Sequence, residues 1–258
     1  MFRRLLFSCL PRDNQYLYRF CKKYVDRYRN ENNDDMRSNG EARFLASTLP
    51  NCRVVFDVGA NVGQWAKMAL GVNATVNLHC FEPSHFTYQR LVANAFPPNV
   101  ICNNFGLGSL PAEGRLLVFE DGSGLNSLYR REGLEAGWGL DVNTREESIR
   151  LETLDNYVES RGLTSRIDLC KIDVEGHELE VLRGMTATLS RCQMGMIQFE
   201  YGGCNIDSRV LLKDIFAFLR KFGYELYKIY PAELRPVPKY DQRLENFQYQ
   251  NWLAQPAT

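Results

Sequence analysis

This sequence of 258 residues lacks several patterns that would assign a protein to a class at once. Its eight cysteines are scattered and never form a Cys-x-x-Cys pair, which argues against a structural zinc site. No apolar run is long enough to cross a membrane, and no repeat or low-complexity tract occurs. The 31 basic residues balance 31 acidic ones, whereas a nucleic-acid binder is usually basic overall. We therefore expect a globular protein with no metal site, no membrane span and no nucleic-acid partner.

The distribution of cysteine also bears on the compartment. Cys80 and Cys170 lie in hydrophobic runs that we expect to form buried strands, where a free thiol behaves as a small apolar residue. Residues 1–10 carry two arginines and a short apolar run but no small-residue cleavage site, so we predict no signal peptide. Unpaired thiols favour a reducing compartment, and the expected location is cytoplasmic.

The phosphate-binding pattern Gly-x-Gly-x-x-Gly is missing as well. After an apolar run, Gly59 and Gly63 are separated by three residues, and Asp57 precedes them. A second apolar run ends in Glu82, about twenty residues further on. A carboxylate beside the glycine loop would repel a pyrophosphate, which argues against a nicotinamide-dependent oxidoreductase. We interpret the two runs as the first two strands of a parallel sheet.

An acid after the second strand suits a ribose, whose hydroxyls donate hydrogen bonds to a carboxylate. A ligand with a cationic amino-acid end and no phosphate suits the first acid, and S-adenosylmethionine is such a ligand. A structural aspartate beside some other nucleotide is the alternative. Asn104 follows the third expected strand and is a candidate for the adenine edge, because an amide both donates and accepts. The predicted cofactor-binding residues are Asp57, Gly59, Asn61, Gly63, Glu82 and Asn104.

Further elements follow in order along the chain. They are Thr-Leu-Asp at residues 153–155, Lys-Ile-Asp-Val-Glu-Gly-His-Glu at 171–178 and Val-Leu-Arg-Gly at 181–184. Together with Asp-Val-Gly-Ala-Asn-Val-Gly at 57–63 and Phe-Glu-Pro at 81–83, they resemble the FkbM family of S-adenosylmethionine-dependent methyltransferases. The resemblance covers about residues 39–201, and the chain departs from it after Asn104, with Gly106 for an alanine and Ser109 where an acid is common.

The resemblance implies a Rossmann-like, doubly wound α/β fold with a mostly parallel sheet, of the class I methyltransferase type. It also implies methyl transfer to a hydroxyl of a sugar or a small secondary metabolite. A hydroxyl needs a base to remove its proton, and the candidates are Asp173, His177 and Glu200, with Asp173 and His177 expected as an oriented pair. Asp173 and Glu200 are also hard oxygen ligands for a divalent cation, but two carboxylates are too few to predict one. A module that binds S-adenosylmethionine without turnover is the alternative function.

The N-terminal part is expected to differ from the rest. Residues 1–38 are predicted as a helical extension with a linker, and residues 39–258 as the methyltransferase domain. Aromatic and apolar residues at helical spacing form one stripe over residues 17–28, and basic residues fill the other face. We expect the stripe to pack on the main domain or on a second subunit as a homodimer; an amphipathic helix on an anionic membrane is the alternative.

A short strand over 116–120 and an irregular insert over 121–147, covering the active site, complete the prediction.

Overall fold

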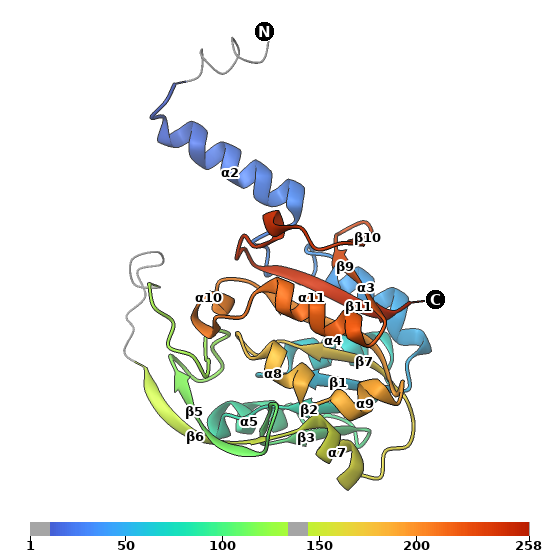
Figure 1. Ribbon diagram of the computed structural model, residues 1–258. Helices are drawn as coiled ribbons and strands as arrows, with labels where there is room; N and C mark the ends of the chain where they lie inside the picture. The colour runs from blue at the N-terminus through green and yellow to red at the C-terminus, as the bar shows by residue number, and fades with distance from the viewer. Residues whose placement is uncertain (1–10, 134–143, 258) are drawn as a thin grey trace.

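The computed structural model describes residues 11–133 and 144–257, which form two sheets flanked by helices (Figure 1). The larger sheet has eight strands in the order β10-β9-β11-β8-β7-β1-β2-β3. Its strands are β1 (Val54–Val58), β2 (Asn77–Phe81), β3 (Val100–Asn103), β7 (Ile167–Ile172), β8 (Met194–Tyr201), β9 (Tyr224–Ile229), β10 (Leu234–Pro236) and β11 (Gln250–Pro256).

The strand directions confirm the predicted doubly wound, mostly parallel sheet. Strands β3, β2, β1, β7 and β8 are parallel, whereas β11 runs antiparallel between β8 and β9. Strand β11 pairs with β9 and also with β8. The chain crosses from β3 at one edge to β7 beside β1, so the strand order reverses at β1. In such sheets ligands bind at the carboxyl ends of the strands near this switch point.

Helices cover both faces of this sheet. Along β1, Val55 packs in one core with Trp65, while Phe56 packs in the other with Tyr157. Because both faces are buried, the strands read as nearly continuous apolar runs. The first face carries α3 (Glu41–Thr48), α4 (Gln64–Val72) and α5 (His85–Val92), and the second carries α7 (Leu154–Ser160), α8 (Glu178–Arg183), α9 (Thr186–Ser190) and α11 (Leu212–Lys221). The short elements η1 (Leu49–Asn51), α10 (Cys204–Ser208) and η2 (Gln242–Leu244) lie in the connections.

The helical segment after β7 is divided into two helices, α8 and α9. The break falls at Gly184, where a Cβ atom would lie 2.0 Å from the carbonyl oxygen of Gly108. The close approach of these two backbones requires a glycine, and the helix ends there.

A second sheet of three strands has the order β4-β6-β5. Its strands are β4 (Gly106–Leu107), β5 (Ala112–Val118) and β6 (Arg145–Glu152). The irregular insert predicted over 121–147 is therefore wrong from residue 145 on, and residues 134–143 of it lie outside the described residues. In strand β6, most side chains are charged, and Ile149 lies among them as a buried residue. Ile149 is 3% exposed and packs on β5. Alternating burial is typical of a strand with one solvent-exposed face. The many charged residues made this strand difficult to recognise in the sequence.

Helix α2 (Gln15–Arg29) extends away from the domain (Figure 1). The Asn14 side chain accepts a hydrogen bond from Leu17 N at 2.9 Å, and Asn30 ends the helix in a left-handed conformation. No residue of α2 is buried, so the expectation that its aromatic stripe packs on the main domain is wrong. Among the helices that the structure describes, none combines the length and apolar character needed to cross a bilayer.

Candidate functional site

A charged pair is buried in the centre of the large sheet. Asp57 on β1 and Lys171 on β7 are register partners, so their side chains leave the same face of the sheet. The Asp57 Oδ1 atom lies 3.6 Å from Lys171 Nζ, and the two residues are 0% and 5% exposed. Both carboxylate oxygens of Asp57 lack a hydrogen-bond partner within the described residues. Asp57 therefore depends on the Lys171 ammonium for compensation of its charge.

The surroundings shift the pKa values of this pair in the same direction for different reasons. Burial raises the pKa of Asp57 to about 6, and the Lys171 charge opposes that rise. Burial alone would lower the pKa of Lys171, but the nearby carboxylates of Asp173 and Asp57 outweigh it and raise that pKa above its usual range. Lys171 thus stays an ammonium at any ordinary pH.

Lys171 also contacts the predicted base. Asp173 follows β7, and its Oδ2 atom lies 3.0 Å from Lys171 Nζ. The Asp173 side chain is 27% exposed, whereas the Asp57 side chain is fully enclosed. Lys171 therefore joins the buried acid of β1 to the accessible acid of β7. We did not select Lys171 from the sequence, although a lysine inside an apolar strand requires buried partners and is a usable indication.

The glycine loop after β1 is held by the acid after β2. Glu82 accepts hydrogen bonds from the backbone N–H of Asn61 at 3.0 Å and of Ser84 at 2.9 Å. Burial raises the pKa of Glu82 to about 7, and these two backbone bonds oppose the rise. The predicted ribose acid and the predicted glycine loop are therefore in direct contact.

Gly59 and Gly63 have φ values of 82° and 84°, which favour glycine. A Cβ atom on Gly59 would lie 1.8 Å from the carbonyl oxygen of Asp173, so this glycine is required by the β7 loop of the same chain. A Cβ on Gly63 would lie 2.9 Å from side-chain atoms of Leu91 and Phe96. At both glycines the close contact is with the protein itself. Packing within the chain is therefore a second reason for glycine at these positions, beside the predicted close approach of a ligand.

Two asparagines border the same loops. The Asn61 Oδ1 atom is buried without a hydrogen-bond partner among the described residues. The Asn104 side-chain nitrogen donates to the carbonyl oxygens of Glu82 at 3.0 Å and of Pro83 at 3.2 Å. Asn104 therefore fixes the loop after β2 with its nitrogen, and its contact with adenine stays a prediction.

Three carboxylates converge after β7 and β8. One oxygen each of Asp173, Glu175 and Glu200 lies within 4.8 Å of the others. Burial, followed by the charge of Asp173, raises the pKa of Glu175 to about 8 and the pKa of Glu200 well above its usual value. Tyr249 donates to Glu200 Oε1 at 2.7 Å, and Arg131 pairs with Glu175 Oε2 at 2.8 Å. Each of the three carboxylates already has a protein donor, and we assign no metal ion to the cluster.

A segment of the insert lies against the loop after β7. Alternate side chains make the contacts: Ser127 Oγ donates to the Glu175 carbonyl at 2.7 Å, and Arg131 reaches the Glu175 carboxylate. Arg131 also lies 3.5 Å from Asp207 on α10. The described part of the insert therefore covers this loop, and its position over an active site stays a prediction. Neither Arg131 nor Tyr249 stood out in the sequence.

His177 is placed apart from the carboxylates. Its Nδ1 atom lies 2.8 Å from the Tyr129 hydroxyl, and within the described residues it forms no hydrogen bond with Asp173. Burial lowers the pKa of His177, which favours the neutral ring. The oriented Asp173–His177 pair that we expected is not formed, because the insert supplies Tyr129 as the partner. Asp173 and Glu200 are brought together, and the catalytic roles of all three residues stay predictions.

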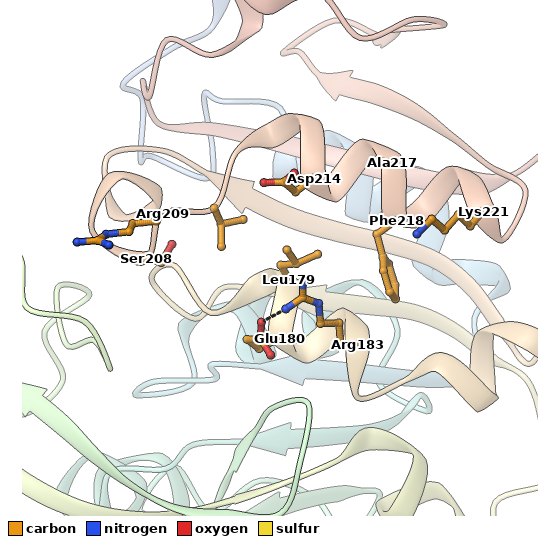
Figure 2. Close-up of a pocket in the computed structure, with 10 residues that line it drawn as sticks. Leu179, Glu180, Arg183, Ser208, Arg209, Asp214, Ala217, Phe218 and Lys221 are labelled. Carbon is orange, nitrogen blue, oxygen red and sulfur yellow. Dashed lines mark hydrogen bonds and ion pairs between the residues drawn. The ribbon is translucent and has the colours of Figure 1, made fainter.

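A surface groove lies elsewhere, between α8 and α11 (Figure 2). It measures about 640 Å³ and is lined by side chains that include Leu179, Arg183 and Phe218. None of the predicted cofactor-binding residues lines it. We therefore place the candidate site at the strand ends and not in this groove.

The profile of the Methyltransferase FkbM domain matches residues 57–226. The chain belongs to the FkbM methyltransferase family. The resemblance predicted from the motifs is thereby confirmed.

Two relatives illustrate the similarity of this FkbM-family protein to named methyltransferases. It is 32% identical to the hexuronic acid methyltransferase AglP of Haloferax volcanii over 164 residues, which is 62% of this chain and 61% of that protein. It is 29% identical to the 31-O-demethyl-FK506 methyltransferase FkbM of Streptomyces tacrolimicus over 154 residues, which is 51% of this chain and 59% of that protein. The chain thus spans about three-fifths of the length of these relatives. The crystal structure of methyltransferase FkbM from Methylobacillus flagellatus is 13% identical, with a TM-score of 0.49, covering 78% of this chain and 43% of that chain.

Proposed function

We propose that this protein transfers a methyl group from S-adenosylmethionine to a hydroxyl of a sugar or a small metabolite. The observation that carries the proposal is the bond between Glu82 Oε2 and the Asn61 N–H at 3.0 Å, which unites the ribose acid and the glycine loop at the strand ends. The relatives support the acceptor class, since one is named for a hexuronic acid and the other for 31-O-demethyl-FK506.

The residues present fit a cationic ligand without phosphate. The Asn61 N–H, which a phosphate would need, is already bonded to Glu82, and the buried Asn61 Oδ1 has no partner among the described residues. We assign the ribose to Glu82 and the adenine to Asn104, with Asp57 contributing its charge from beneath the loop. When bound, S-adenosylmethionine supplies an electrophilic methyl carbon on a sulfonium leaving group.

The protein aligns the acceptor and removes one proton. We assign the base to Asp173, because it is the accessible acid of the cluster and Lys171 fixes its position at 3.0 Å. Glu200 has a raised pKa through burial and is better suited to hold the acceptor by a hydrogen bond than to take its proton. The acceptor proton moves to the Asp173 carboxylate as the oxygen attacks. We also propose a reducing, cytoplasmic compartment, which the free state of seven described cysteines supports.

Calorimetry tests the cofactor assignment. S-adenosylhomocysteine should bind and NAD should not, and Glu82→Ala should weaken S-adenosylhomocysteine binding by about 1–3 kcal/mol, as for a lost charge-assisted hydrogen bond. Equal affinity of wild type and variant would remove Glu82 from the ribose.

Turnover with a panel of hydroxylated glycans and metabolites tests the chemistry. Asp173→Asn keeps the shape and removes the base, so the rate should fall about 10²–10⁴-fold while S-adenosylhomocysteine affinity is retained. His177→Gln is the matched control and should change the rate little. Near-normal turnover of Asp173→Asn would exclude it as the base, and binding without any turnover of the wild type would favour a binding module.

A further inference from the structure

Helix α2 exposes a large aromatic surface to solvent. Tyr18, Phe20, Tyr24 and Tyr28 are 66%, 70%, 65% and 68% exposed, and no residue of the helix is buried. Contiguous apolar surface of this kind marks an interaction site. The helix is also well formed, because side chains of Asn14 and Lys22 stabilise its first turn and its middle.

The side chains of α2 separate into two faces. At 100° per residue, the apolar and most of the aromatic side chains occupy one arc, and the charged side chains occupy the opposite arc. The helix carries five basic residues and one acid, a net charge of +4, so the remainder of this neutral chain carries −4. Arg27 and Arg29 border the apolar arc on its two sides. The apolar arc consists of Leu17, Tyr18, Phe20, Cys21, Tyr24, Val25 and Tyr28.

We propose that α2 binds the surface of an anionic membrane and lies in its interfacial plane. A basic polar face opposite an aromatic face is the composition of such helices. Its 15 residues span about 22 Å, which is shorter than the roughly 30 Å hydrocarbon core, so the helix lies on the bilayer and does not cross it. Charge decides between the two occupants of this face. A second copy that packed its own α2 against this helix would place +4 against +4, whereas anionic headgroups complement the charge.

The base of the helix is fixed beside the candidate site. The Asn30 side-chain nitrogen donates to the Asn39 carbonyl at 2.6 Å and to the Ile229 carbonyl at 3.0 Å. The Asn32 N–H donates to the carbonyl of Tyr249 at 3.0 Å, and the hydroxyl of that tyrosine bonds to Glu200. A helix seated on a membrane would therefore hold the carboxylate cluster close to the lipid surface.

Co-sedimentation of the full chain with vesicles tests the proposal. Binding should be strong with phosphatidylcholine vesicles that contain 30% phosphatidylglycerol, weak with phosphatidylcholine alone, and reduced by salt. Each basic residue near an anionic surface strengthens binding about fivefold, so Lys23→Gln with Arg27→Gln should weaken it about 25-fold. Phe20→Ser with Tyr24→Ser should abolish it.

Matched controls use side chains of similar exposure outside α2. Leu110→Ser, at a residue 70% exposed, and Arg115→Gln with Arg183→Gln should leave vesicle binding unchanged. Equal binding to neutral and anionic vesicles, or no binding to either, would overturn the proposal. A dimer in lipid-free light scattering that Phe20→Ser with Tyr24→Ser dissociates would also overturn it and assign the face to a second copy. Because these variants lie outside the domain core, their melting temperatures should match the wild type.

Discussion

The acid that follows β2 and the carboxylates at the ends of β7 and β8 are held by different kinds of donor. On the side of β1 and β2, Glu82 accepts from the backbone N–H groups of Asn61 and Ser84. On the side of β7 and β8, the donors are side chains, with Lys171 on Asp173, Arg131 on Glu175 and Tyr249 on Glu200.

This difference teaches how each side is built. A backbone donor keeps its place as long as the loop keeps its conformation, which suits the recognition of an invariant ligand. A side-chain donor can rotate away and let an acceptor take its place, which suits a site where groups exchange partners. On the β7–β8 side the donors themselves can be deleted by substitution, whereas at Glu82 only the acceptor can be replaced, and the predictions below test that contrast.

The largest effect is expected at Lys171. Lys171→Met leaves Asp57 buried without compensation and releases Asp173, so the free energy of unfolding should fall by about 3–5 kcal/mol in urea titrations. Lys228→Met is the matched control. That lysine is 9% exposed, its pKa is lowered to about 8 by burial, and it pairs with no carboxylate within the described residues, so its loss should cost far less. Similar costs for the two variants would contradict the ion-pair account.

The second effect concerns pH on the β1–β2 side. The pKa of Glu82 is about 7 when folded, against an ordinary value of 4.5, so the folded protein binds this proton more tightly than the unfolded chain. The corresponding stability is complete below pH 4.5 and is lost as the pH rises through 7, by roughly 3 kcal/mol. Glu82→Gln should flatten the fall in unfolding free energy between pH 5 and 8. Identical slopes for wild type and variant would show that Glu82 does not titrate in this window.

A moderate effect is expected where the insert meets the β7 loop. Arg131→Met removes the partner of Glu175 and Asp207 and should lower the free energy of unfolding by about 2 kcal/mol, between the values typical of exposed and buried pairs. The Arg131 side chain is 9% exposed, whereas Arg115 is 80% exposed in its pair with Glu146. Arg115→Met should therefore change stability by less than about 0.5 kcal/mol. If Arg131→Met lowered the free energy of unfolding no more than Arg115→Met does, the ion pairs of Arg131 would not stabilise the packing of the insert.

The smallest effect is expected at Tyr249. Tyr249→Phe removes one hydrogen bond to Glu200 and should cost about 1 kcal/mol of unfolding free energy. Tyr227→Phe is the control, because its hydroxyl contacts Glu225 at an exposed position and its loss should be close to neutral. Thermal unfolding of both variants measures the difference, and a neutral Tyr249→Phe would place Glu200 outside any side-chain network.

The same contrast explains what the sequence could predict. The apolar runs and the glycine loop are local patterns, and they lead to the correct strands because the residues involved are neighbours in the chain. Glu82 is placed at the adjacent strand end, and its contact with a ribose stays a prediction. Arg131 and Tyr249 reach the cluster from 44 and 49 residues away, through contacts that no periodicity marks. His177 was misjudged for the same reason, since its partner Tyr129 lies 48 residues away in an insert that reads as irregular.

Gly59 lies where the loop after β1 meets the loop after β7. Its Cα lies so close to the Asp173 carbonyl that not even a methyl group fits between the two loops. A displacement of one loop must then displace the other, and the pair behaves as a single mechanical part. Ligand uptake above the glycines should consequently restrain the backbone that carries Asp173, the base that we propose.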